Sequence, residues 1–252
     1  MRNPTISERR TGTTAAGAPT SVPLRVLDEG ARLLQSGGPL PGFDVYVVGF
    51  HCAKGEPDFQ MEAHHFCRVV NDDLLQCVLF DGNTRDANLI GVEYIVSGRL
   101  HATLDPAEQA YWHPHNFEVL SGQLAAPGLP ERVERELMAR LLNSYGKTWH
   151  TWHTSTGAPD AGLPLGDPKL MWSFNREGEC DEALIRDRNE AMGLDTAGRR
   201  ESRRTLEPDA EPQHGVDAMR DDFPGSVPVP GVRDADAGSP DTGGPDSDDE
   251  RA

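Results

Sequence analysis

The chain has 252 residues and a formal net charge of −17. An acidic chain repels phosphate groups, so this balance argues against nucleic acid as a partner and against docking on an anionic membrane surface. The apolar runs are too short to cross a bilayer, so no transmembrane segment is predicted. The first residues carry no secretory signal pattern, and we therefore predict a soluble, cytoplasmic protein.

Both ends of the chain have the composition of disordered segments. Residues 1–21 contain almost no large apolar side chain, and the last fifty residues are rich in Pro, Gly and Asp. Between Glu201 and Ala252 there are fourteen acidic residues and five arginines, a net charge of −9. Such segments bury too little apolar surface to offset the entropy lost on ordering. The sequence therefore predicts a disordered segment at 1–21, a single domain at 22–193 and a disordered acidic tail at 194–252.

The first half of this domain has the pattern of one helix followed by strands. Within residues 22–35, apolar side chains recur at the spacing of a short amphipathic helix. Runs of β-branched and aromatic residues follow, and the polar residues 71–73 join two of these runs as a hairpin turn. Strands are predicted at 44–53, 63–70, 74–81 and 87–97.

The second half mixes helices and strands. Asp105 and Pro106 have the pattern of a helix start, and helices are also predicted at 131–146 and 181–193. Further strands are predicted at 115–125 and 147–154, and residues 168–175 fit either type. Short turns join many of the strands, and no βαβ rhythm is present. We therefore predict an α+β fold, a mostly antiparallel sheet with two or three packed helices.

The four cysteines show no CxxC spacing. Without an export signal, the simplest expectation is that they are reduced, buried thiols. They are Cys52, Cys67, Cys77 and Cys180.

Eight of the nine histidines lie in the predicted domain, and six of them form three close pairs. Alternate residues of a strand share a face, so Glu62 and His64 point to one side of the sheet and His65 to the other. The odd spacing of His150 and His153 allows only one of them to join a site on a given face.

These residues suggest a metal site, because imidazole and carboxylate groups are common ligands of divalent transition metals. The hypothesis takes His64, His113 and His115 as ligands, with Glu62 or Glu118 as the carboxylate. Such a metal could polarise a carbonyl or activate water. Further candidates are His65, His150 and His153. The alternative is that the histidines are core residues with ordinary hydrogen-bond partners. The sequence identifies no catalytic residue and leaves open whether the protein is an enzyme.

Seven ordered segments resemble the oil body-associated proteins, whose shared domain is a domain of unknown function. They are GFHCAKG (49–55), EAHHFC (62–67), LIGVEYIVS (89–97), WHPHNFEV (112–119), SGQLAAPGLPE (121–131), YGKTWHTWH (145–153) and GLPLGDPKLM (162–171). The resemblance covers about residues 22–175. It implies an association with seed lipid droplets for the plant members, and it carries over no catalytic residue.

Three functions are compatible with these patterns. The first is a non-catalytic structural or interaction protein of the oil body-associated type, of uncharacterised biochemical activity. The second is a metal-dependent enzyme that uses the His/Glu cluster on a small or lipid-like substrate, and the third is a ligand-binding barrel lined by histidines. No lipid-anchoring hairpin is present, so any lipid contact would be peripheral. The apolar strands 44–53 and 87–97 leave a homodimer interface open.

Overall fold

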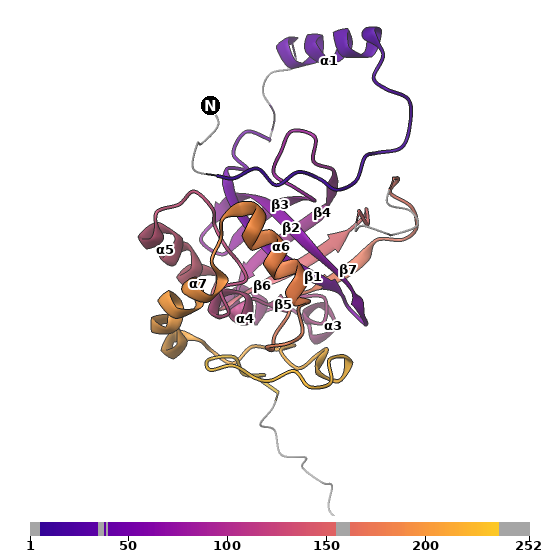
Figure 1. The fold of residues 1–252 in the computed structure, drawn as a ribbon. Coiled ribbons are helices and arrows are strands. Elements are labelled where there is room, and N and C mark those ends of the chain that lie inside the picture. The colour runs from indigo at the N-terminus through magenta and orange to yellow at the C-terminus, as the bar shows by residue number, and fades with distance from the viewer. Residues whose placement is uncertain (1–5, 35–37, 39, 155–161, 237–252) are drawn as a thin grey trace, which may run out of the picture.

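The structure is a computed structural model, and it describes residues 6–34, 38, 40–154 and 162–236. Its centre is a β-barrel (Figure 1). Six strands form the barrel: β1 (Val45–Ala53), β2 (Glu56–Asn71), β3 (Leu74–Phe80), β4 (Leu89–Ser97), β6 (Ser144–His150) and β7 (Lys169–Trp172). They run in the order β4-β3-β2-β1-β7-β6, and a pairing of β4 with β6 closes the ring. The short β5 (His113–Pro114) adds to the other edge of β6.

The predicted α+β fold class is wrong, because the sheet closes on itself instead of lying open beneath helices. The strand pairings are antiparallel, as expected. However, β4 and β6 pair along seven residues, from Gly91 opposite His150 to Ser97 opposite Ser144. Gly91 permits this close approach, since a Cβ there would lie 2.2 Å from the carbonyl oxygen of Trp149. Closure depends on strands far apart in the chain, which local patterns do not report.

The interior of the barrel is identified by the alternation along β4. Gly91, Glu93 and Ile95 are buried, whereas Val92 and Tyr94 between them are exposed. Directly opposed residues share a face of a sheet, so the register extends the interior face from strand to strand. Polar side chains therefore enter a compartment that small barrels usually fill with apolar ones.

The predicted hairpin is confirmed as β2 and β3, with β2 longer than expected. In its register Cys67 lies opposite Cys77, and the two form a disulfide. The prediction of four reduced thiols is therefore wrong for this pair, because the hairpin places the two Cβ atoms side by side. Cys52 and Cys180 are free and buried, as predicted.

Residues 115–125 do not form the predicted strand. His115 caps a one-turn helix, α4 (Asn116–Leu120), whose five residues are all buried. A short apolar run cannot be assigned to helix or strand by periodicity alone, and here Gly122 then turns the chain with a φ of +80°. The turn at Asp105 and Pro106 begins α3 (Pro106–Gln109), as predicted, and α2 (Gly98–His101) precedes it.

The longer helices were predicted more closely. α5 (Glu131–Leu141) is shorter than expected because β6 begins at Ser144. α6 (Glu182–Met192) is capped by the Asp181 side chain and ends at Gly193 in the left-handed conformation. The unassigned segment 168–175 contributes β7.

The domain does not end at residue 193. The next residues form α7 (Thr196–Arg203), followed by the 3₁₀ helices η1 (Arg204–Asp209) and η2 (Arg220–Asp222). Leu206, Val229 and Val232 belong to the hydrophobic core, so disorder from residue 194 is wrong for the described part of this segment. The rest of the predicted tail, 237–252, lies outside the described residues. At the other end, Thr13 is buried and Arg9 pairs with Glu62, although residues 6–21 form no helix or strand.

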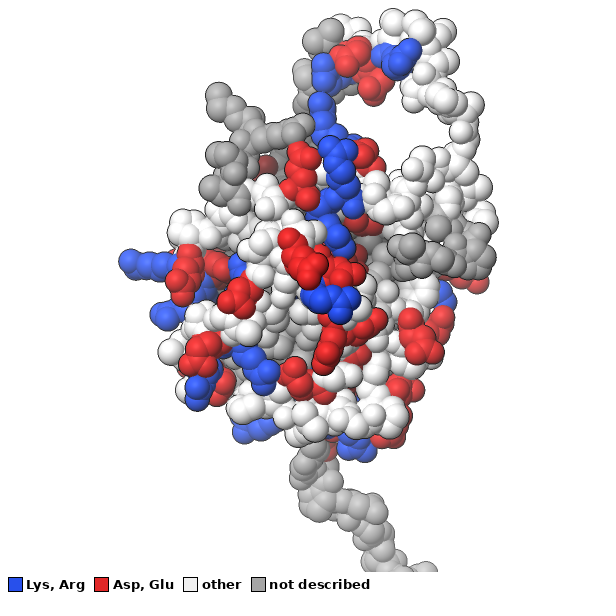
Figure 2. Space-filling model, in the orientation of Figure 1, with Lys and Arg blue, Asp and Glu red and all other residues white. Residues whose placement is uncertain are grey.

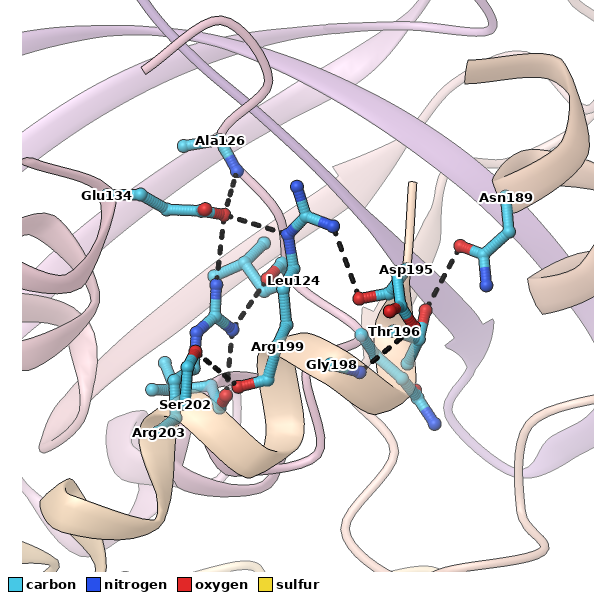
Figure 3. Close-up of polar contacts among 12 residues, drawn as sticks. Leu124, Ala126, Glu134, Asn189, Asp195, Thr196, Gly198, Arg199, Ser202 and Arg203 are labelled. Carbon is cyan, nitrogen blue, oxygen red and sulfur yellow. Dashed lines mark hydrogen bonds and ion pairs between the residues drawn. The ribbon is translucent and has the colours of Figure 1, made fainter. Parts of the chain in front are cut away.

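A buried polar cluster joins α7 to α4, to α5 and to the segment between them (Figure 3). The guanidinium of Arg203 donates to the carbonyl oxygens of Val119 and Leu124, each at 2.8 Å, and to Glu134 at 3.1 Å. The same Glu134 oxygen accepts from Arg199 and from the backbone N–H of Ala126. The cluster therefore gives the buried guanidinium of Arg203 and the buried carbonyl of Leu124 hydrogen-bond partners.

We expect Arg203→Lys to lower the free energy of unfolding by about 1–3 kcal/mol, because an ammonium cannot reproduce the planar fork of contacts. Urea unfolding measures this change. The matched control is Arg200→Lys on the same helix, where the side chain is 44% exposed and pairs with Glu177. A loss below about 0.5 kcal/mol is expected there, and equal losses at both positions would contradict the assigned role of the cluster.

Candidate functional site

Five histidines and one glutamate gather in the barrel interior. Each lies on a strand or at the start of α4, and each is at most 3% exposed. They are His51 on β1, His65 on β2, Glu93 on β4, His113 on β5, His115 at the start of α4 and His150 on β6.

Glu93 is the centre of this group. Its Oε2 accepts from the Nε2 of His65 at 2.9 Å, while its Oε1 lies 3.4 Å from the Nε2 atoms of both His113 and His115. Glu93 therefore belongs to two groups of possible metal ligands. His51, His65 and Glu93 form one set, and Glu93, His113 and His115 form the other.

His51 and His150 complete the interior group. The Nδ1 of His51 lies 3.4 Å from the Nε2 of His150, and the Nδ1 of His150 lies 3.0 Å from the sulfur of Met61. The ring of His51 also meets the rings of His65 and His113, with centroids 5.1 and 5.6 Å apart. Imidazoles thus form a continuous layer across the interior.

The environment shifts the pKa values of two buried carboxyl groups, Glu93 and Glu118, in opposite directions. Burial alone would raise the pKa of Glu93, but the imidazoles of His65, His113 and His115 hold it well below its usual value. Burial and the charge of Glu93 raise the pKa of Glu118, whose Oε2 lies 3.9 Å from His115, well above its usual value. Two carboxyl groups whose pKa values are shifted in opposite directions therefore lie near the same Nε2 atom of His115, an arrangement that suits ion binding or proton transfer.

The structure brings some of the predicted ligands together and adds residues that the sequence did not single out. His113 and His115 do meet, with Glu118 beside His115. His113 and His115 do not lie on one face of a strand, because β5 ends at Pro114. Glu93 and His51 were not among the candidates. The signal for Glu93 was a single charged residue within the apolar run LIGVEYIVS.

His64 and Glu62 do not belong to this centre, so the proposed ligand set cannot form as written. They lie on the outer face of β2, where the Nε2 of His64 is 2.9 Å from Glu62 and its Nδ1 is 2.7 Å from the hydroxyl of Tyr46. Arg9 pairs with the other oxygen of Glu62 at 3.0 Å. Strand periodicity had correctly separated His64 from His65.

The pair at positions 150 and 153 also behaves as strand spacing predicted. His150 enters the barrel at the end of β6, and His153 lies beyond this strand, edge-on to the ring of Phe59 with centroids 4.7 Å apart. Only one of the two joins the interior group.

Comparison with known proteins places this architecture in a family. The family model described as "Protein of unknown function (DUF1264)" matches residues 38–207. Oil body-associated protein 1A of Zea mays is 38% identical over 200 residues, which cover 79% of this chain and 82% of that protein. The chain belongs to the oil body-associated protein family. Every residue of the interior group lies within the matched region.

Other relatives agree with this assignment. Oil body-associated protein 2B of Zea mays is 41% identical over 72% of each chain. Oil body-associated protein 1B of Arabidopsis thaliana is 34% identical over 81% of this chain and 83% of its own length. No solved structure matches the chain. The relatives' names describe a cellular association and no chemistry.

Proposed function

We propose that this member of the oil body-associated family is an interaction protein that attaches from the cytoplasm to the surface of neutral lipid through α1 (Val22–Leu34). The observation that carries the proposal is the position of this helix. α1 stands away from the barrel at the end of a long connection (Figure 1), and, among its residues with a described burial, all are exposed except the half-buried Gly30.

The two faces of α1 differ in chemistry. The apolar stripe contains Leu24 and Leu27, which are 56% and 68% exposed, and continues through Ala31 and Leu34. The four charged residues, Arg25, Asp28, Glu29 and Arg32, recur at three- and four-residue spacing on the opposite side. A helix with this division lies in a lipid–water interface with its apolar face inserted.

The charge of the helix favours an uncharged or zwitterionic surface as its partner. Two arginines and two acidic residues leave α1 without net charge, while the whole chain carries −17. On the face shown in Figure 2, acidic and basic side chains are interspersed on α1 and below it. No helix among the described residues combines the length and the apolar character of a membrane span. Attachment by one inserted face is consistent with both findings.

The test is flotation of the purified full chain with triolein droplets coated by a phosphatidylcholine monolayer. We expect Leu24→Gln/Leu27→Gln to lower the affinity at least tenfold, because burying a leucine fully is worth about 1.5–3 kcal/mol. Glutamine keeps the helix propensity of leucine, so α1 itself should persist. Droplets coated with anionic phosphatidylserine should bind the wild type less well.

The matched control is Leu163→Gln/Leu165→Gln, the same change at two exposed leucines outside α1. This control should float like the wild type. Equal flotation of the α1 variant and the wild type would contradict the proposal. A shift of the α1 variant from dimer to monomer in sedimentation, without a change in flotation, would instead identify a second copy of the chain as the partner of this helix.

A further inference from the structure

We propose that the barrel interior is a metal centre in which Glu93 Oε1 and the Nε2 atoms of His113 and His115 bind one divalent transition-metal ion. This inference is independent of α1 and of lipid attachment. It assigns a metal-binding site to the residues that the fold, and no single segment, brings together.

The spacing of the three ligand atoms is the first argument. Glu93 Oε1 lies 3.4 Å from each of the two Nε2 atoms, longer than the usual 2.7–3.2 Å of an N–H···O hydrogen bond. Two atoms bound about 2.1 Å from a tetrahedral ion are about 3.4 Å apart. The separation therefore fits ligands that face a common ion better than it fits partners in hydrogen bonds.

The second argument is a set of buried polar atoms without partners. Among the described residues, neither Glu93 Oε1 nor either ring nitrogen of His113 has a hydrogen-bond partner. Both side chains are at most 2% exposed. Buried polar atoms are rarely left unsatisfied in proteins, because each costs about 1–3 kcal/mol. A cation between them would satisfy Oε1 and the His113 Nε2 together.

The third argument is the tautomer of His115. The hydroxyl of Ser144 donates to the carbonyl oxygen of Leu141 at 2.7 Å, so its oxygen must accept from the Nδ1 of His115, 2.8 Å away. This bond places the proton of a neutral imidazole on Nδ1 and leaves a lone pair on Nε2. A lone pair aimed at a carboxylate oxygen is repulsive unless a cation lies between them. Ligand histidines commonly have this second contact.

The three ligand atoms also approach Gly146 on β6 closely. A Cβ built on this glycine would lie 2.2 Å from Glu93 Oε1 and 2.6 Å from the Nε2 atoms of both His113 and His115. The three atoms therefore converge on the same side of this glycine, which has no side chain to keep them apart. A side chain at position 146 would push all three from their places.

The donor set identifies the class of ion. Two imidazoles and one carboxylate suit zinc and the divalent ions of iron, manganese, cobalt and nickel. Three protein ligands leave coordination positions open, where water or a small molecule could bind. His65 holds the other oxygen of Glu93 at 2.9 Å and so fixes the orientation of the carboxylate.

The test measures metal directly. The untagged full chain, produced in medium supplemented with zinc and iron, is analysed for metal by plasma mass spectrometry, and the chelator-treated protein is titrated with Co²⁺ while its visible spectrum is recorded. We expect about one ion per chain and the d–d bands of a bound Co²⁺. Gly146→Ala should lose both signals although it keeps every ligand. Gly30→Ala on α1, where a Cβ meets nothing within 4 Å, should keep them.

Two further variants keep the proposal testable if Gly146→Ala does not fold. Glu93→Gln preserves the shape of the side chain and should lower Co²⁺ affinity at least a hundredfold. His64→Gln removes a buried histidine from the outer face and should leave affinity unchanged. Full metal retention by Gly146→Ala or by Glu93→Gln would overturn the proposal. So would a wild type that binds no Co²⁺, or loss of metal in His51→Gln with retention in His113→Gln.

Discussion

Replacing Glu93 with alanine is expected to lower the free energy of unfolding of the metal-free protein by about 3–5 kcal/mol, the cost typical of breaking a buried charged cluster from one side. The carboxylate is 2% exposed, pairs with His65 at 2.9 Å and lies 3.4 Å from His113 and His115. Its removal leaves the His65 Nε2 without its acceptor and opens a cavity among five imidazoles. Urea unfolding in the presence of a chelator measures the change.

Glu56→Ala is the control for this substitution. Glu56 begins β2 and pairs with Lys169, but its side chain is 54% exposed. An exposed pair contributes at most about 1 kcal/mol, so the same loss of a carboxylate should matter little there. If Glu93→Ala cost no more than Glu56→Ala, the interior carboxylate would not organise the histidines, and the metal site would lose its central ligand.

The elements that the sequence predicted well are those whose causes are local. α1 was placed by its apolar spacing, and the start of α3 by Asp105 followed by Pro106. The hairpin of β2 and β3 was placed by a polar turn between two alternating runs. In each case the deciding contacts lie within a few residues of one another, so composition and periodicity report them.

The closure of the barrel had no such local cause. β4 reads as apolar on both faces, and nothing in LIGVEYIVS shows whether Glu93 points into a core or toward water. The answer comes from the pairing of β4 with β6, which begins only at Ser144 and brings Gly146 opposite Ile95. The strand predicted at 115–125 was wrong for a related reason, because its apolar run fits a helix and a strand equally.

The candidate site was predictable only in part for the same reason. His113 and His115 were found because they are neighbours in the chain, and His64 was wrongly joined to them because its distance from them in space could not be read. Glu93 and Gly146 are neighbours of these histidines only in the closed barrel. The site is assembled from five strands and the start of α4, so its residues become visible once the register of those strands is known.

Acidification from pH 7 to pH 5 in the presence of a chelator is expected to destabilise the protein. Burial and the neighbouring His65 and His153 lower the pKa of His150 to about 3, and burial and His214 lower that of His101 to about 4. Unfolded, each would titrate near 6.5. Between pH 7 and pH 5 these two histidines therefore bind protons in the unfolded state and stay neutral in the folded state. Each of them lowers the free energy of unfolding by about 2 kcal/mol over this interval.

Other groups shift in both directions. Burial also lowers the pKa values of His51, His64 and His113, which adds to the loss. Burial raises the pKa of Glu179 to about 7 and that of Glu118 well above its usual value. These carboxyl groups have the opposite effect, because they bind protons at a higher pH in the folded state than in the unfolded state. Glu179 raises the free energy of unfolding by about 2 kcal/mol over the same interval. Five histidines against two carboxyl groups leave a net loss.

His101→Phe isolates one contribution, because phenylalanine can keep the stacking on Tyr145, where the ring centroids are 3.6 Å apart, but cannot bind a proton. The free energy of unfolding, measured in urea at both pH values, should fall by about 2 kcal/mol less in this variant than in the wild type. The comparison uses the difference between two pH values, so any constant cost of the substitution cancels. Identical pH dependence in the two proteins would mean that folding does not change the pKa of His101.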